Sequence, residues 1–448
     1  RKAAAYIESQ FRLFGLLPAW NGNFQQTYPV YQDSLVRSSI SINGIAFEPD
    51  SDFVVTSNSS HNISFNASEV LFAGYGRSDS LWDDYKNINA RGKIVMVFPG
   101  IPTMLVKGKK VKLRAVDLYT LQEAALKNGA IGLLIGDKNF PFKPSPAKGY
   151  PYVNDYRKLN YPNTFFISEK IASAIMGADF AIAKKAIKTT MPAPALKSYF
   201  VSVLLELDKT LITMESSNVL GYIEGTDKKE EAMIITAHYD HLGIKGDSII
   251  YQGADDDGSG TVAVLEIAKA FAKSKAEGKG PRRSIIFMTV SGEEEGLWGS
   301  SYYSENPAWP LDKTSVDLNI DMIGRTEARR SMGDSMNYVY IVGDNRLSSD
   351  LRTISEETNN KFSHLLLDYK YNDPNDPEHI FERSDHYNFA RKGVPIIFYF
   401  NGIHEDYHRP SDTPDKINYE ILKKRAQFIF YTAWNIANRE DMIKRDLP

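Results

Sequence analysis

The strongest constraint on the fold is a regular alternation of short apolar runs and helical patterns that begins after about Ser217. Such alternation indicates a mixed, mostly parallel sheet that is covered by helices on both faces. The predicted strands are Ala232–Ala237, Ser284–Val290, Val316–Asp321, Tyr338–Val342 and Val394–Phe400. Sites in sheets of this kind form outside the strand ends, so the polar residues that directly follow these runs are the first candidates for function.

Helical patterns flank the predicted strands. An apolar stripe that includes Val264, Ala268 and Phe271 predicts a helix between the first two strands. A final helix is predicted from about Tyr419 to Asn438, and an N-terminal helix ends near Gly15. The fold class expected from these elements is α/β.

A middle region interrupts this pattern. Residues from about 46 to 205 contain short apolar runs bounded by Gly, Asp and Pro, together with one plausible helix at Asp117–Lys127. Because 448 residues exceed one ordinary core, we expect more than one domain. We predict an N-terminal part over 1–45, a β-rich insert over 46–205 and the main domain over 206–448.

Composition excludes several classes of function. The chain has no cysteine, so a bound metal ion must be held by His, Asp and Glu. With 53 Lys and Arg against 56 Asp and Glu, the net charge of −3 favours neither nucleic acid nor an anionic membrane. No apolar run reaches the roughly 18–20 residues of a membrane span. The sequence does not indicate an oligomeric state.

Five potential metal ligands follow the predicted strands in one order along the chain. They are His238, Asp256, Glu294, Asp321 and His408. Two divalent ions about 3.5–4 Å apart need such converging oxygen and nitrogen ligands, with one carboxylate shared between them. They also need a base that is not a ligand, and Glu293 stands directly before Glu294. The order therefore predicts a two-metal hydrolytic site.

The segment Gly253–Gly260 carries three consecutive carboxylates in a glycine-rich run. These carboxylates repel one another unless a cation is present, while the glycines let the backbone approach a metal. A calcium EF-hand loop does not fit, because aligning Gly258 with the loop's fixed glycine places Gly253 at the first ligand position. Asp240 follows His238 closely and is a suitable partner for its second ring nitrogen. The adjacent His241 is interpreted as a structural or supporting residue.

The string His404-Glu-Asp-Tyr-His408 offers a rival reading, because it matches the H-E-x-x-H signature of single-zinc proteases. That signature requires a helix, so that both histidines face one metal ion. A predicted strand and Asn401-Gly402 precede the string, and Pro410 follows it. We therefore interpret His408 as a ligand from a loop.

Taken together, these strings resemble the co-catalytic zinc exopeptidases of the bacterial leucyl aminopeptidase and glutamate carboxypeptidase family. The strings are His238-x-Asp240, Gly253-Ala-Asp-Asp-Asp-Gly-Ser-Gly260, Glu293-Glu-x-Gly-Leu-x-Gly-Ser300, Asp321-Met322 and Tyr407-His-x-x-x-Asp-Thr413. They cover most of residues 217–420 in the family's order. The middle region is similar to a protease-associated domain through Tyr85-x-x-Ile88, Arg91-Gly-Lys-Ile-Val95 and Gly129-Ala-x-Gly132.

The resemblance implies a division of roles around two Zn²⁺ ions per chain. One ion would be bound by His238, Asp256 and Asp321, and the other by Asp256, Glu294 and His408. The remaining roles implied are a general base at Glu293, an oxyanion-binding hydroxyl at Tyr407, an orienting carboxylate at Asp240 and a cis peptide between Asp256 and Asp257. Many members carry a small residue at the position of His241, whose role stays open.

The expected function is that of a zinc metallo-aminopeptidase that hydrolyses the N-terminal bond of peptides by means of a water activated between the ions. Three alternatives remain: a mono-zinc aminoacyl cyclotransferase of the glutaminyl cyclase type, a carboxypeptidase of the same fold, and a non-enzymatic receptor whose peptidase-like domain has lost its metal ligands. Since every ligand position is filled, the receptor is disfavoured. The chain starts at Arg1, and we expect an exported protein whose leader is absent from this sequence.

Overall fold

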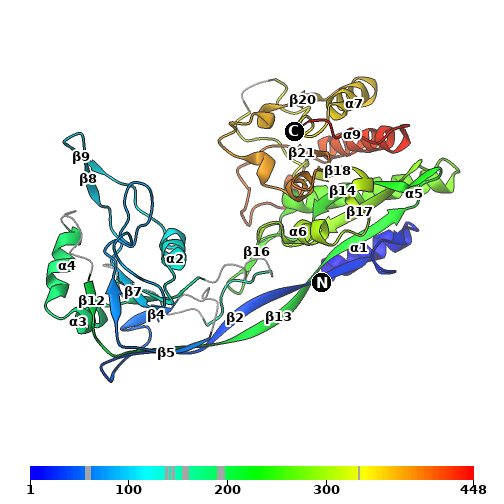
Figure 1. The fold of residues 1–448 in the computed structure, drawn as a ribbon. Helices are drawn as coiled ribbons and strands as arrows, with labels where there is room; N and C mark the ends of the chain where they lie inside the picture. Colours follow the sequence, from blue (N-terminus) through cyan, green and yellow to red (C-terminus); the bar gives the residue numbers. More distant parts are fainter. Residues whose placement is uncertain are drawn as a thin grey trace. The chain divides into compact units, whose positions relative to one another are not determined.

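The structure is a computed structural model that describes residues 1–55, 62–136, 140, 143, 147–153, 161–188, 197–330 and 333–447. It divides into two compact units, and Figure 1 shows their elements. Unit 1 consists of Arg1–Tyr28 and Glu215–Pro448, and unit 2 consists of Pro29–Met214. We expected the divisions at 45/46 and 205/206. They lie elsewhere because two long strands, β2 (Gln25–Ile42) and β13 (Val203–Ile223), each continue across a boundary.

Unit 1 is built on a mixed sheet with the strand order β20-β19-β21-β18-β14-β17-β13. The strands are β14 (Lys228–His238), β17 (Arg283–Val290), β18 (Thr314–Ile320), β19 (Tyr338–Val342), β20 (Leu366–Asp368) and β21 (Ile396–Phe400). The central neighbours β17, β14, β18 and β21 are parallel. Antiparallel pairs join β13 to β17 and β19 to β21. The expectation of a mixed, mostly parallel sheet is confirmed.

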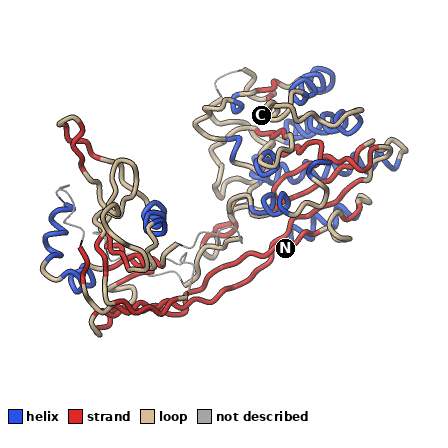
Figure 2. Tube along the Cα trace, in the orientation of Figure 1, coloured by secondary structure: helices blue, strands red, loops and turns tan. Residues whose placement is uncertain are grey.

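Helices cover both faces of this sheet. Successive residues of a strand point to opposite faces, so neighbouring residues pack into two different cores. Ile235 and Phe287 pack into one core with α1 (Lys2–Leu13), α5 (Gly260–Ala276), α7 (Asp350–Thr358) and α9 (Tyr419–Asn438). Their neighbours Ile234 and Ile286 pack into a second core with α6 (Trp298–Glu305) and α8 (His386–Ala390). Figure 2 shows helices along the strands of this unit.

The predicted helices of unit 1 are present. The final helix has the predicted bounds, and α1 lies where the N-terminal helix was expected. Asn418 begins α9, where its side chain accepts a hydrogen bond from the backbone N–H of Ile421. We did not predict the hairpin of β15 (Gly243–Lys245) and β16 (Ile249–Tyr251). Its residues are mostly exposed, so no alternation of buried and polar residues marks it.

Unit 2 contains a sheet with the strand order β12-β6-β7-β10-β11-β4. These strands are β4 (Phe53–Val55), β6 (Val70–Phe72), β7 (Ile94–Val97), β10 (Gly132–Gly136), β11 (Asn163–Ile167) and β12 (Lys197–Tyr199). Further strands of this unit are β3 (Ile45–Phe47), β5 (Ile63–Ala67), β8 (Thr103–Val106) and β9 (Lys109–Lys112), while β1 (Leu17–Pro18) belongs to unit 1. The neighbours from β6 to β11 are parallel.

In the part of unit 2 that the structure describes, three helices accompany the sheet: α2 (Leu118–Lys127), α3 (Glu169–Met176) and α4 (Asp179–Lys188). Leu121 of α2 and Ile171 of α3 belong to different core clusters. The region is therefore rich in strands, as predicted, but its helices contribute to the core as well. Its likeness to a protease-associated domain stays a prediction.

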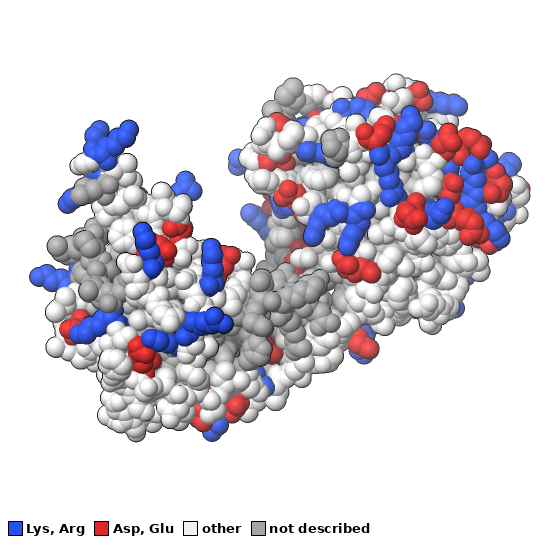
Figure 3. All heavy atoms as spheres, in the orientation of Figure 1, with Lys and Arg blue, Asp and Glu red and all other residues white. Residues whose placement is uncertain are grey.

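Among the described residues, no helix is both long enough and apolar enough to cross a membrane. On the face of unit 1 seen in Figure 3, Lys and Arg alternate with Asp and Glu. Extended patches of Lys and Arg are typical of proteins that bind polyanions. The mixed face agrees with the near-neutral net charge of the whole chain.

Candidate metal centre

Three predicted ligand positions lie at one edge of the unit 1 sheet. β14 ends at His238, β17 is followed by Glu293 and Glu294, and β18 is followed by Asp321. Because these strands are parallel neighbours, their carboxyl ends meet at the same edge. His238 is fully buried and Asp321 is largely buried, although burying such groups is costly unless they are paired.

Asp256 reaches this edge from the segment Ala254–Ser259, where its own backbone angles are not helical. Asp412 holds the segment: its carboxylate accepts hydrogen bonds from the backbone N–H groups of Asp255 and Asp256 at 3.0 and 3.2 Å. The peptide bond between Asp256 and Asp257 is cis, as the resemblance implied.

The first ligand group gathers around the imidazole of His238. Its Nε2 lies 3.3 Å from Oδ1 of Asp256 and 3.7 Å from Oδ1 of Asp321. Ser384 donates a hydrogen bond to the other oxygen of Asp321 at 2.8 Å. That contact leaves Oδ1 of Asp321 facing His238, so the three predicted ligands converge.

The second group gathers around His408, which lies in the loop after β21. Its Nε2 is 3.1 Å from Oδ2 of Asp256 and 3.1 Å from Oε2 of Glu294. Asp256 thus offers one oxygen to each group, which is the arrangement that a shared carboxylate requires. His241 also enters this group, since its Nδ1 lies 2.7 Å from Oε1 of Glu294 but 3.9 Å from Asp256.

Asp257 is close to His238 and Asp321 as well. However, its carboxylate accepts hydrogen bonds from three backbone N–H groups, those of His238, Gly260 and Met322. These contacts fix the segment against two strand ends, and they occupy both carboxylate oxygens of Asp257 as hydrogen-bond acceptors. We therefore interpret Asp257 as a structural residue.

The donor atoms fit divalent metal ions. Buried atoms that lack a hydrogen-bond partner among the described residues include Nε2 of His238, Oδ2 of Asp256, Oε1 of Glu294 and Oδ1 of Asp321. Unpaired buried polar atoms are rare and require an explanation. Imidazole and carboxylate together are the ligands that Zn²⁺ takes in catalytic sites, and they converge here from both groups.

The electrostatics of the cluster also favour cations. Burial alone would lower the pKa of His408, yet the carboxylates of Asp256 and Glu294, each 3.1 Å from its Nε2, raise it to about 9. Burial likewise opposes a charge on His238, but the carboxylates of Glu293 and Asp321 raise its pKa well above the ordinary value. Positive charge is therefore stabilised at both groups.

Glu293 stands beside the two groups. Its Oε2 lies 3.8 Å from Nε2 of His238, and burial raises the pKa of its carboxyl well above the usual range. Its backbone N–H donates a hydrogen bond to the carboxylate of Asp240 at 3.3 Å. The backbone oxygen of Asp240 lies 3.1 Å from Nδ1 of His238, whereas its carboxylate is 3.8 Å away. The contact with His238 is thus closer from the main chain than from the predicted carboxylate.

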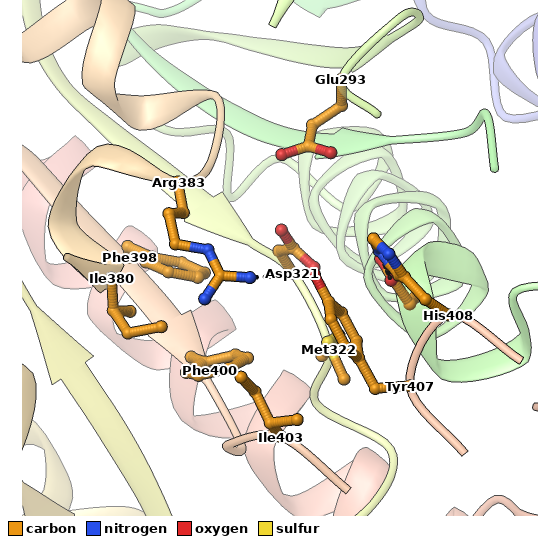
Figure 4. A pocket seen from close by; sticks show the side chains of 11 residues that line it. Glu293, Asp321, Met322, Ile380, Arg383, Phe398, Phe400, Ile403, Tyr407 and His408 are labelled. Carbon is orange, nitrogen blue, oxygen red and sulfur yellow. Dashed lines mark hydrogen bonds and ion pairs between the residues drawn. The ribbon is translucent and has the colours of Figure 1, made fainter. Parts of the chain in front are cut away.

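Tyr407 lies on the open side of the cluster, in a pocket that Figure 4 shows from close by. Its ring stacks on His408 with centroids 3.9 Å apart. Its hydroxyl oxygen accepts a hydrogen bond from Nη2 of Arg383 at 3.1 Å, and burial raises the pKa of this hydroxyl. The hydroxyl therefore stays protonated at neutral pH and can donate its own hydrogen.

The helical reading of the H-E-x-x-H string is wrong. Residues 401–413 form turns and irregular loop, and only His408 reaches the two groups. The side chain of His404 contacts Asp255 instead, with its Nε2 3.2 Å from Oδ2 of that residue. Both side chains are fully buried. The pair joins the loop of His408 to the segment of Asp256.

Replacing His404 by alanine is expected to lower the free energy of unfolding by about 3 kcal/mol, because Oδ2 of Asp255 would lose its buried polar neighbour. Urea denaturation measures the change. Replacing the adjacent, exposed Glu405 by alanine is the matched control, and it should change stability by less than about 0.5 kcal/mol. Equal losses in the two variants would contradict a structural role for the pair.

Sequence reasoning missed three residues that contact the cluster. His241 was named but given no ligand contact, although H-x-D-H spacing next to a strand end was a usable signal. Ser384 and Arg383 lie before α8, in a segment without any apolar strand pattern. Their contacts with Asp321 and Tyr407 join positions 63 and 24 residues apart, and single-sequence spacing does not predict such contacts.

Residues 218–433 match the model of one family, described as Peptidase family M28. A probable zinc metalloprotease from Pyrenophora tritici-repentis is 35% identical over 127 residues, which cover 26% of this chain and 24% of that protein. Aminopeptidase YwaD from Bacillus subtilis is 25% identical over 246 residues, which cover 52% of this chain and 47% of that protein. The chain thus spans about a quarter to a half of the length of these curated relatives.

A solved structure shares the fold over the whole chain. The aminopeptidase from Aneurinibacillus sp. strain AM-1 superimposes with a TM-score of 0.53 at 19% identity. The match covers 100% of this chain and 90% of the other. At this identity the likeness concerns the architecture alone.

Proposed function

Because residues 218–433 make this chain a member of peptidase family M28, we propose that it is a zinc aminopeptidase that acts on the N-terminal bond of peptides. The observation that carries the proposal is the shared carboxylate of Asp256. Its two oxygens face two different histidines, His238 at 3.3 Å and His408 at 3.1 Å. A single-metal site would not need this arrangement.

Two zinc ions are the proposed cofactors. His238, Asp256 and Asp321 would hold one, and Asp256, Glu294 and His408 the other. Zinc in such a site lowers the pKa of a water to about 7 and polarises a carbonyl group. The carboxylates of the cluster would also attract the positively charged α-amine of a peptide, which favours cleavage at the N-terminus.

Glu293 is the proposed general base. It is buried beside the ligands without belonging to either group, so its carboxylate is free to take a proton from the attacking water. The same carboxyl group then protonates the leaving amine. Its hydrogen bond through the backbone to Asp240 fixes the loop that carries it, and such positioning is a condition for efficient proton transfer.

Tyr407 is the proposed donor to the carbonyl oxygen. Arg383 donates to the hydroxyl oxygen of Tyr407, so the hydroxyl hydrogen points elsewhere and can reach a substrate. A donor placed where negative charge develops stabilises the transition state more than the ground state. The proposed substrates are peptides. We also propose that the protein is exported from the cell.

The choice between His408 and His241 as zinc ligand is open to a direct test. His408 lies at 3.1 Å from both Asp256 and Glu294, whereas His241 approaches only Glu294. Replacing His408 by alanine is expected to reduce the zinc content from two ions to one per chain, and replacing His241 should leave two. Elemental analysis of the dialysed variants measures this, and the reverse outcome would assign the ligand to His241.

Adding zinc to the metal-free protein is expected to stabilise it, because the cations relieve the repulsion among clustered carboxylates. At a zinc concentration 100 times Kd, one bound ion adds about 2.7 kcal/mol to the free energy of unfolding. Thermal unfolding with and without zinc measures the gain. Magnesium at the same concentration is the control, since it disfavours imidazole ligands. An unchanged Tm with zinc would contradict the proposed ligands.

A further inference from the structure

The pocket beside the metal centre combines an apolar wall with one arginine. Its apolar side chains belong to Met322, Ile380, Phe398, Phe400 and Ile403. Its acidic side is formed by Asp256, Glu293 and Asp321. Figure 4 shows the guanidinium of Arg383 pointing into the space between these two sides. Apart from His408, Arg383 is the only basic residue among those that line the pocket.

The guanidinium of Arg383 is only partly used by the protein. Nη2 donates one hydrogen bond to the hydroxyl oxygen of Tyr407. Among the described residues, no carboxylate forms an ion pair with it, in contrast to Arg325, which pairs with Glu405 and Asp406. A guanidinium carries five N–H donors. Most of those of Arg383 are therefore available to a ligand in the pocket.

The acidic side of the pocket includes two of the proposed zinc ligands, Asp256 and Asp321, so the ions would engage these carboxylates. A negatively charged group of a substrate that lies away from the ions needs another cation to bind it. Arg383 is the place where such a group can be bound, and the planar guanidinium matches a carboxylate with two parallel hydrogen bonds. The apolar wall would contact the aliphatic carbons that carry the carboxylate.

We infer that Arg383 binds a carboxylate of the substrate close to the bond that is cleaved, and so determines which peptides are preferred. This inference rests on the proposed function. The carboxylate can come from two sources: an acidic side chain on the N-terminal residue, or the free C-terminus of a dipeptide. Both present the same chemistry to the guanidinium, and matched substrates separate them.

The test uses two pairs of substrates and the zinc-loaded full chain. One pair is glutamyl- and glutaminyl-p-nitroanilide, which differ by one side-chain carboxylate. The other is Leu-Leu and its C-terminal amide, which differ by the terminal carboxylate. The wild type is expected to prefer the carboxylate in one of the two pairs by about 10- to 100-fold in kcat/KM, the range of a hydrogen-bonded charge pair. The pair that shows the preference identifies the source.

In the variant Arg383→Met, the preference within that pair is expected to disappear. Because Arg383 also contacts Tyr407, the neutral substrate will lose some activity too, so the ratio within the pair is the decisive quantity. Arg391→Met is the matched control: Arg391 is an exposed arginine eight residues along the chain that does not line the pocket. Its variant should keep the wild-type ratio.

Three results would contradict the account at different points. The inference is overturned if the wild type shows no preference in either pair. It is also overturned if Arg383→Met lowers kcat/KM equally for both members of a pair. In both cases cleavage of the neutral substrates still supports the proposed function. Failure of the zinc-loaded wild type to cleave any of the four substrates contradicts the proposed function itself.

Discussion

Replacing Glu293 by glutamine is expected to lower kcat by about 10²–10⁴-fold, the usual contribution of a general acid or base. Glutamine has the same shape but cannot accept the proton of the attacking water. Because Glu293 belongs to neither ligand group, the variant should keep its zinc. Steady-state kinetics with leucyl-p-nitroanilide measures kcat, and elemental analysis of the same sample measures the metal.

The matched control is Glu295→Gln, two residues along the same loop and without a contact to either histidine group among the described residues. It should retain activity within a few-fold. If Glu293→Gln stayed fully active, the proton would have to be taken by another group. If it lost zinc, Glu293 would be a ligand, and the division of roles between Glu293 and Glu294 would be wrong.

Replacing Asp256 by alanine is expected to have the other large effect, the loss of zinc from both positions. Its two oxygens face His238 and His408, so no other single change removes a donor from both groups. Activity should fall by about 10³-fold or more, since the metal supplies several kcal/mol of transition-state stabilisation. Zinc content and kcat are measured together.

Asp247→Ala serves as the control for this variant, because Asp247 is an exposed acid in the neighbouring β15–β16 hairpin. It should bind the same amount of zinc as the wild type. Retention of two tightly bound zinc ions by Asp256→Ala would exclude Asp256 as the shared ligand. Circular dichroism of each variant establishes that a loss of zinc does not reflect unfolding.

The architecture of unit 1 could be predicted because its strands are buried on both faces. A strand such as Arg283–Val290, in which every residue is buried, stands out as an apolar run. The long amphipathic helix at Tyr419–Asn438 has a clear apolar stripe and an Asn cap. Short helices such as His386–Ala390 contain too few residues to show a periodic pattern, and they were missed.

The convergence of the site followed from topology rather than from any one motif. Parallel neighbouring strands bring His238, Glu294 and Asp321 to one edge of the sheet. This placement follows once the strands are recognised as parallel neighbours. The loop contacts were not accessible in the same way. That Asp412 supports the Asp256 segment, and that His404 turns away from the site, depends on side-chain directions in irregular loops.

The nature of unit 2 is the least resolved part of the sequence prediction. Its strand-rich character was recognisable, but the ends of the unit were not, because β2 and β13 are continuous strands of 18 and 21 residues with no break at either boundary. A change of composition marks a boundary only where a linker separates two units. Its likeness to a protease-associated domain rests on three short strings in the sequence.

The most direct test of a two-zinc aminopeptidase is a titration of the metal-free protein with zinc, followed by hydrolysis of leucyl-p-nitroanilide. Activity is expected to rise until two equivalents of zinc per chain are bound and then to stay constant. Full activity at one equivalent, or release of ammonia from an N-terminal glutamine substrate in place of peptide hydrolysis, would contradict the account and favour a mono-zinc cyclotransferase.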